Sequence, residues 1–128
     1  MYKTLTMALC TRLKRRVFTS GQCKQMAKTE LVRSLGSINV YITNILFLEY
    51  GIILELENRD DLPSSEIAYT IRSATSKKIR DEFAEFSRMP SLWQREYFCR
   101  DGKSSENGQL SEDIKKEIEA FYDKQKTR

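Results

Sequence analysis

The sequence of 128 residues contains no histidine, the side chain that proteins use most often for metal binding and for proton transfer near neutral pH. Imidazole ligands and imidazole bases are therefore excluded. The sequence also contains no apolar run that approaches the roughly 20 residues of a membrane-spanning helix, so we expect no membrane span. A basic cluster follows the N-terminal stretch, and no small-residue cleavage site is present, so we expect no signal peptide.

Cysteine is scarce as well. Cys10, Cys23 and Cys99 are odd in number and lack the spacing of zinc ligands, which favours free thiols over disulfide bonds or a zinc site. Free thiols indicate a reducing compartment, so we expect a cytoplasmic protein. Repeats and low-complexity tracts are also absent. The length, with 40% hydrophobic and 31% charged residues, is typical of one soluble domain that spans residues 1–128.

The positive charge is concentrated in the first part of the chain. The net charge is +4, but residues 1–40 contain eight lysines and arginines against one acid, a charge of +7, so the remaining residues carry −3. Four of these cations lie in the stretch TRLKRR, as Arg12, Lys14, Arg15 and Arg16. A cluster this dense attracts phosphate backbones. The alternative interpretation is a solvated turn that keeps the protein soluble.

The hydrophobic pattern predicts the order strand, helix, strand, strand, helix, strand, helix. Strands are predicted where polar and apolar residues alternate or where β-branched and aromatic residues accumulate, and helices where apolar residues recur at helical period after a capping residue. The first six elements match the ferredoxin-like pattern, an antiparallel sheet with helices on one face, here followed by a C-terminal helix, so we expect an α+β fold. The predicted strands cover residues 2–11, 38–48, 51–57 and 96–100, and residues 101–109 are expected to form an exposed loop. The first predicted helix runs from the cap Thr19 or Ser20 to Leu35, and the second runs from the cap Ser64 or Ser65 through Phe86. The third runs from the cap Ser111 to Lys126 and has cations in its final turn.

Four stretches carry recognisable motifs in this order. The stretch TRLKRRVF (Thr11–Phe18) is similar to T-K-x-R-R-x-V-F, and SATSKKIRDEF (Ser73–Phe83) is similar to K-x-x-S-x-x-L-R-x-E-F. The stretch LWQREYFCRDG (Leu92–Gly102) is similar to L-W-x-x-x-Y-F-x-x-x-x-G, and IEAFYDKQ (Ile118–Gln125) is similar to V-x-x-Y-I-E-x-Q. In these motifs the chain resembles the single-tyrosine transposases of the IS200/IS605 type across nearly its whole length. Members of that family cut and rejoin single-stranded DNA at the foot of small hairpins.

The resemblance implies an active site with a metal and a nucleophile. In the family, two histidines that flank one residue on a strand hold a divalent cation, because residues i and i+2 point to the same face. A tyrosine on the last helix attacks the phosphate, and a glutamine one turn later completes the metal site. By position, Glu49 and Gly51 replace the two histidines, Phe121 replaces the tyrosine, and Gln125 is retained. The resemblance therefore implies an enzyme fold that has lost its chemistry, and we expect neither a bound metal nor a cofactor.

Tyr122 leaves one alternative open. A slip of one residue would bring its phenol near the old site, and Glu49 and Gln125 could supply oxygen ligands to Mg²⁺ or Mn²⁺. One helical step rotates a side chain by about 100°, so Tyr122 is expected to point elsewhere if Phe121 faces the site. The other interpretations are that Ile118, Tyr122 and Gln125 form a stripe along the helix, and that Glu49 is an ordinary edge-strand charge.

The sequence thus predicts a catalytically inactive transposase-like protein that binds structured single-stranded DNA or RNA, a hairpin, as a regulator of expression or of an active transposase. A homodimer is expected from the resemblance and from the apolar strand around residues 38–47, which would be an aggregation-prone edge if left unpaired. Two alternatives remain: a protein-interaction module without nucleic-acid binding, and an altered transposase or nuclease that uses Tyr122. The residues expected to contact nucleic acid are Arg12, Lys14, Arg15, Arg16, Lys77, Lys78 and Arg80.

Overall fold

An antiparallel sheet lies at the centre of the computed structural model, which describes residues 3–102, 105–106, 109–110 and 112–125. Within these ranges the sheet has four strands in the order β2-β3-β1-β4, and each neighbouring pair is antiparallel. This is the order of a ferredoxin-like sheet, so the predicted α+β fold is confirmed. The strands are β1 (Lys3–Thr11), β2 (Val40–Leu48), β3 (Gly51–Asn58) and β4 (Trp93–Asp101).

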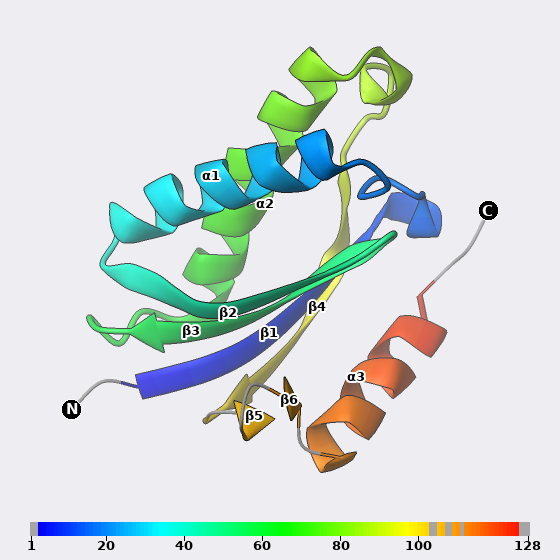
Figure 1. The fold of residues 1–128 in the computed structure, drawn as a ribbon. Helices are drawn as coiled ribbons and strands as arrows, with labels where there is room; N and C mark the ends of the chain where they lie inside the picture. Colours follow the sequence, from blue (N-terminus) through cyan, green and yellow to red (C-terminus); the bar gives the residue numbers. More distant parts are fainter. Residues whose placement is uncertain (1–2, 103–104, 107–108, 111, 126–128) are drawn as a thin grey trace.

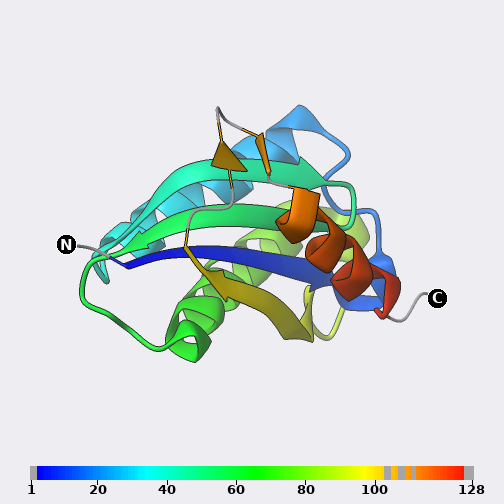
Figure 2. The same cartoon turned by 90° about the horizontal axis from the view of Figure 1, so that it is seen from below.

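The helices cover the two faces of the sheet unequally. Figure 1 shows α1 (Gly21–Gly36) and α2 (Ser64–Glu82) on one face and α3 (Glu112–Asp123) on the other. Because side chains alternate along a strand, β3 serves both layers: Ile52 and Leu54 pack in the large core under α1 and α2, while Ile53 packs in a smaller cluster under α3. Seen from below, α3 crosses the strands toward the end of the sheet where β1 leads into its following turn (Figure 2).

The first helix begins as its sequence predicts. The Ser20 side chain accepts a hydrogen bond from the Cys23 backbone N–H at 3.1 Å, which satisfies one of the free donors of the first turn. Buried residues then recur every four positions along the helix, which fixes the face that packs on the sheet. These residues are Cys23, Ala27, Leu31 and Leu35.

The second helix differs from its prediction at both ends. Pro63 occupies the cap position and makes no side-chain hydrogen bond, while Ser64 lies inside the helix and pairs its hydroxyl with that of Tyr97 at 3.1 Å. The predicted Ser64 or Ser65 cap is therefore wrong. The helix ends at Glu82, and the apolar pattern continues into a short 3₁₀ turn, η2 (Ala84–Phe86), because Phe83 has extended backbone angles.

Three further features of the secondary structure differ from the prediction. Strand β4 begins at Trp93, earlier than the predicted strand, because Trp93 pairs with Thr11 beyond a shift in the register between β1 and β4. Two short paired strands, β5 (Ser105–Glu106) and β6 (Gln109–Leu110), lie in or beside the stretch predicted to be a loop. The last turn of α3 carries no basic residue, and the predicted limits Ser111 and Lys126 lie outside the described residues. In the part of the chain that the structure describes, no helix is long and apolar enough to cross a membrane.

Candidate functional site

Tyr122 fills the space beside Gly51. The Tyr122 hydroxyl donates to the carbonyl oxygen of Leu9 at 2.9 Å, and the carbonyl oxygen of Ile52 lies 3.2 Å away. A Cβ atom at position 51 would lie 2.4 Å from the Leu9 oxygen and 2.7 Å from the Tyr122 hydroxyl. Any side chain here, including histidine, would force the sheet or α3 to move. Glycine is thus required by the close approach of its neighbours.

The expectation that Tyr122 points elsewhere depended on Phe121 facing the site, and in the structure Tyr122 is the residue that faces it. The residues of α3 that face the sheet form one row, and this row contains Tyr122. The interpretation of Tyr122 as part of a stripe along the helix is therefore confirmed. Phe121 lies one step round the helix and packs against Phe98, with ring centroids 6.3 Å apart. The reason is the way α3 docks on the sheet, which no motif specifies. The buried row consists of Ile114, Ile118 and Tyr122 of α3, and it continues in Gln125, two residues beyond the end of the helix.

Burial makes the Tyr122 phenol a poor nucleophile. Its side chain is 4% exposed, and burial, with smaller contributions from Cys10 and Tyr50, raises its pKa well above the ordinary range. A phenol attacks phosphorus as its phenolate, which this environment disfavours. The neighbouring Cys10 thiol is also buried, which raises its pKa to about 11 and keeps it protonated.

The other positions carried over from the resemblance are engaged in local contacts. The Gln125 amide donates to the Phe121 carbonyl oxygen at 3.0 Å, and the residue is buried. The Glu49 carboxylate accepts two hydrogen bonds from the Arg16 guanidinium, at 2.7 and 3.1 Å. Within the described ranges, no group of three or more His, Cys, Asp or Glu side chains is placed to hold a metal ion.

The basic stretch after β1 divides into two halves. A short 3₁₀ turn, η1 (Arg12–Lys14), contains Leu13 and Lys14 at φ values of 55° and 53°, an uncommon conformation for two consecutive residues that are not glycine. One half of the stretch faces the β2–β3 connection, where the Lys14 ammonium lies 5.6 Å from the Tyr50 ring and Arg16 pairs with Glu49. The other half, Arg12 and Arg15, lines cavities on the side of α2.

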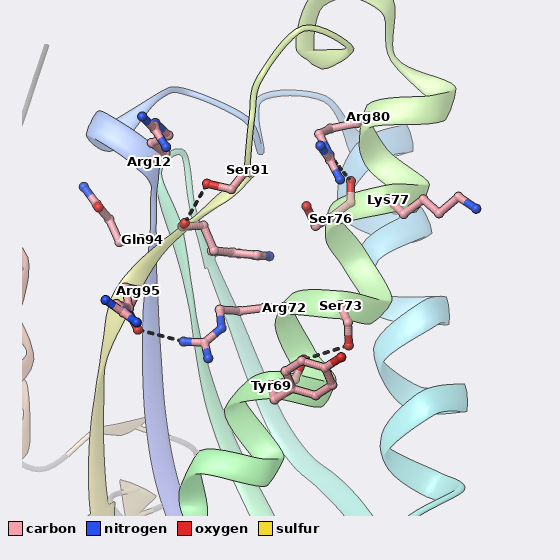
Figure 3. Close-up of a pocket in the computed structure, with 11 residues that line it drawn as sticks. Arg12, Tyr69, Arg72, Ser73, Ser76, Lys77, Arg80, Ser91, Gln94 and Arg95 are labelled. Carbon is pink, nitrogen blue, oxygen red and sulfur yellow. Dashed lines mark hydrogen bonds between the residues drawn. The ribbon is translucent and has the colours of Figure 1, made fainter.

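The larger of these cavities is a groove between α2 and β4, which we call the α2–β4 groove. It has a volume of about 670 Å³, and no aspartate or glutamate lines it. Figure 3 shows Tyr69, Arg72 and Arg80 projecting from α2, with Arg12 and Arg95 on the opposite side. Its residues are Arg12, Tyr69, Arg72, Ser73, Ser76, Lys77, Arg80, Ser91, Trp93, Gln94 and Arg95.

Two of the arginines in the groove brace its walls. The Arg72 guanidinium donates to the Arg95 carbonyl oxygen at 2.7 Å, which joins α2 to β4 (Figure 3). Arg80 donates to the carbonyl oxygens of Ser76 and Met89, at 3.2 and 3.1 Å, which joins α2 to the loop before β4. These bonds satisfy donors without neutralising the charge, because carbonyl oxygens carry no net charge.

A second, smaller cavity of about 140 Å³ adjoins Arg12 and extends the basic surface over η1. Arg15 and Arg88 line it together with Glu85. The structure therefore brings Arg12 and Arg80 together in the groove and places Arg15 next to them. Lys77 also lines the groove, although its ammonium end points away from β4 in Figure 3. Lys78, which was grouped with them by sequence, instead pairs with Glu82 at 3.5 Å.

Among the basic and aromatic residues of the groove, Tyr69, Arg72 and Arg95 are not predicted from the sequence. Tyr69 and Arg72 lie before the SATSKKIRDEF motif, and Arg95 lies inside the LWQREYFCRDG motif, at a position that the motif leaves open. One signal was available, because Tyr69, Arg72, Ser76 and Arg80 recur at intervals of three or four on a helix and hence share a face.

Comparison with known proteins identifies two solved structures with a similar fold. No protein-family model matches the chain, and no curated protein matches it. A candidate transposase from Deinococcus radiodurans superimposes with a TM-score of 0.83 at 13% identity, over 100% of this chain and 95% of that protein. A REP-associated tyrosine transposase, solved bound to a REP hairpin, superimposes with a TM-score of 0.59 at 13% identity, over 94% of this chain and 64% of that protein. The chain thus has the fold of these two transposase structures, and it spans less than two thirds of the length of the second protein.

Proposed function

We propose that the protein binds structured single-stranded nucleic acid, a hairpin of DNA or RNA, without cleaving it. The observation that carries this proposal is the α2–β4 groove, where four arginines surround one cavity and no carboxylate lines it. Such a concentration of like charge is unfavourable unless an anion binds there, and a phosphate backbone supplies regularly spaced anions. The fold adds support, since a neighbour with the same fold is bound to a hairpin.

The absence of cleavage is inferred from the residues at the former catalytic positions. Phe121 has no oxygen to attack a phosphate, and Gly51 has no side chain to bind a metal. Tyr122, the phenol next to Phe121 in sequence, is buried and donates its hydrogen to a backbone carbonyl, and the ring of Tyr50 packs edge-on against it with centroids 5.3 Å apart. A protein that holds a hairpin but leaves it intact would act as a regulator, by covering the hairpin or by competing with an active transposase. Three free cysteines favour a cytoplasmic location for this role.

Gel shifts with DNA and RNA stem-loops at several salt concentrations test the binding. Each phosphate neutralised contributes about −0.7 to the slope of log K against log salt on a single strand, so four contacts give a slope of about −3. Replacing Arg12 and Arg15 by glutamine should weaken binding to every stem-loop and flatten the slope by about one to two units. The double variant Arg33→Gln and Arg59→Gln, at cations that pair with Glu30 and Glu57, is the matched control and should bind like the natural protein.

Denaturing gels with the same labelled stem-loops and Mg²⁺ test the absence of cleavage. We expect no covalent protein–DNA adduct and no shortened strand. An adduct that Tyr122→Phe abolishes would establish the alternative of a displaced active site. Stem-loops that fail to bind below about 100 μM at low salt, weaker than typical non-specific binding, would favour the protein-interaction module instead.

A homodimer formed through β2 is part of the same proposal. Strand β2 lies at the edge of the sheet and contains no charged residue, while Tyr41 and Leu46 on it are 39% and 48% exposed. An edge of this kind is a template for pairing with a second copy. Light scattering at micromolar concentration should give the mass of a dimer, and Leu46→Lys should give a monomer. A monomeric natural protein would remove the dimer from the proposal.

A further inference from the structure

We propose that the α2–β4 groove holds an unpaired nucleotide that flanks the hairpin stem, with its base on Tyr69 and its phosphates on Arg12 and Arg95. This inference rests on the proposed function and adds to it the part of the nucleic acid that the groove selects. It assigns to the groove an unpaired nucleotide, which the paired stem of a hairpin cannot supply.

Two arginines of the groove have side chains that are available to bind phosphates. Arg12 and Arg95 are exposed, and the side chain of neither forms an ion pair or hydrogen bond with any other part of the described chain. Arg72 lies between the walls and holds Arg95's strand in place through its 2.7 Å bond to the Arg95 carbonyl oxygen. Exposed guanidinium groups on a braced backbone suit phosphate oxygens, which accept two parallel N–H bonds.

Tyr69 provides a surface for a base. It is the most exposed of the large hydrophobic side chains in the described residues, at 67%, and it lies on the wall of the groove (Figure 3). The other aromatic side chain of the groove, Trp93, is 4% exposed and donates its N–H to Thr75 at 2.7 Å, so it belongs to the core. Exposed aromatic rings beside a basic groove are the usual platforms on which unpaired bases stack.

The size and polarity of the groove favour an unpaired base over a paired one. A volume of about 670 Å³ lies within the range of pockets that enclose small ligands, about 300 to 1,000 Å³. Ser73 and Gln94 supply hydroxyl and amide groups, which can bond the edges of a base. A base inside a stem has its edges paired and both faces stacked, so it cannot reach these groups or Tyr69. The groove therefore selects a base outside the stem.

Three probes with the same stem and loop test this inference on the full-length protein. The first is a blunt hairpin, the second carries an unpaired flank of about four nucleotides, and the third carries the same flank with abasic sites, each made as DNA and as RNA. We expect the flank to tighten binding about tenfold and the abasic sites to remove most of that gain, since stacking requires the base.

Variants of groove residues then show which side chains are responsible for the tighter binding of the flanked probe. Tyr69→Leu should lose the advantage of the flank, and Tyr69→Phe should keep it, because the ring stacks without its hydroxyl. Arg95→Gln should flatten the salt slope for the flanked probe by about 0.7, whereas Arg33→Gln on α1 should leave it unchanged.

The outcomes separate this inference from the proposed function. If the natural protein binds none of the probes, both fail. If it binds the hairpin equally well with and without the flank, or if Tyr69→Leu keeps the advantage, the groove does not hold an unpaired nucleotide, and the proposed hairpin binding stands.

Discussion

The face of the sheet under α3 and the α2–β4 groove treat their polar groups in opposite ways. Under α3, the Tyr122 hydroxyl is bonded to a backbone carbonyl oxygen and the Gln125 amide to another. In the groove, Arg12 and Arg95 keep uncompensated charges in contact with solvent. The first arrangement is typical of a structural core, and the second is the one on which the proposed binding rests.

The two surfaces correspond to the two activities that the resemblance implies: catalysis at the face under α3 and nucleic-acid recognition at the groove. The positions where the resemblance implies catalysis are packing positions in this chain, since Gly51 and Tyr122 fit one another. The surface on the other side of the sheet carries the charge that the proposed anionic ligand requires. The comparison therefore predicts that variants under α3 change stability, whereas variants of the groove change binding.

Gly51→Ala should have the largest effect. Its Cβ would lie 2.4 Å from the Leu9 carbonyl oxygen, which belongs to the central strand and cannot move aside without disturbing the pairing of β1 and β3. We expect a loss of about 3 kcal/mol in the free energy of unfolding, measured by urea denaturation. Gly21→Ala is the matched control, because a Cβ there meets nothing within 4 Å and the residue lies in α1. A Gly51→Ala protein as stable as the Gly21→Ala control would show that α3 and the sheet can separate enough to accept a side chain at position 51.

Tyr122→Phe should have the next largest effect. The substitution leaves the ring in place but removes the hydrogen bond to Leu9, so we expect a loss of about 1 to 2 kcal/mol. Tyr41→Phe, at an exposed ring on β2, should leave stability unchanged. Binding to hairpins should be the same for both variants, and a selective loss of binding in Tyr122→Phe would contradict the separation of the two surfaces.

The pH dependence of stability offers an independent test of Tyr122. Burial raises the pKa of its phenol in the folded state above the value of about 10 in the unfolded chain. The folded state therefore holds the proton more tightly, and the contribution is fully present below pH 10 and is lost progressively as the pH rises above it. Stability curves from pH 8 to 11.5 should fall for the natural protein and be flatter for Tyr122→Phe.

The sequence predicts the fold more completely than the site, for a physical reason. Periodicity indicates which residues of an element face inward, and together with the capping residues it was sufficient to predict the order of the strands and helices and to place the start of α1 at Thr19 or Ser20. It does not report how two elements are placed against each other. The contact of Tyr122 with Gly51 depends on the docking of α3, and the groove joins Arg72 of α2 to Arg95 of β4, residues that no single motif contains.

Glu49→Gln should have only small effects on stability and on hairpin binding. The substitution removes the carboxylate that pairs with Arg16, a contact between two largely exposed side chains, so we expect no measurable change in the urea midpoint. Hairpin binding should tighten by less than about threefold, because a freed Arg16 adds at most one phosphate contact. Glu82→Gln, which frees Lys78 on α2, is the matched control. A tenfold gain from Glu49→Gln would mean that nucleic acid also lies over the β2–β3 connection.

The smallest expected effect is that of divalent metal ions, and we expect none. Three oxygen or nitrogen ligands near one point are the least that a tight Mn²⁺ site requires, and the former metal positions offer two at most. The Glu49 carboxylate is held by Arg16, and the Gln125 side chain is buried, with its amide bonded to the Phe121 carbonyl oxygen. The third position, Gly51, has its space occupied by Tyr122. Calorimetric titration with Mn²⁺ at micromolar concentrations should therefore show only heats of dilution, with the Glu49→Gln protein giving the same trace. A stoichiometric heat that Glu49→Gln removes would mean that α3 can leave the sheet and expose a metal site, and the face under α3 would then be a switchable surface and not a packed one.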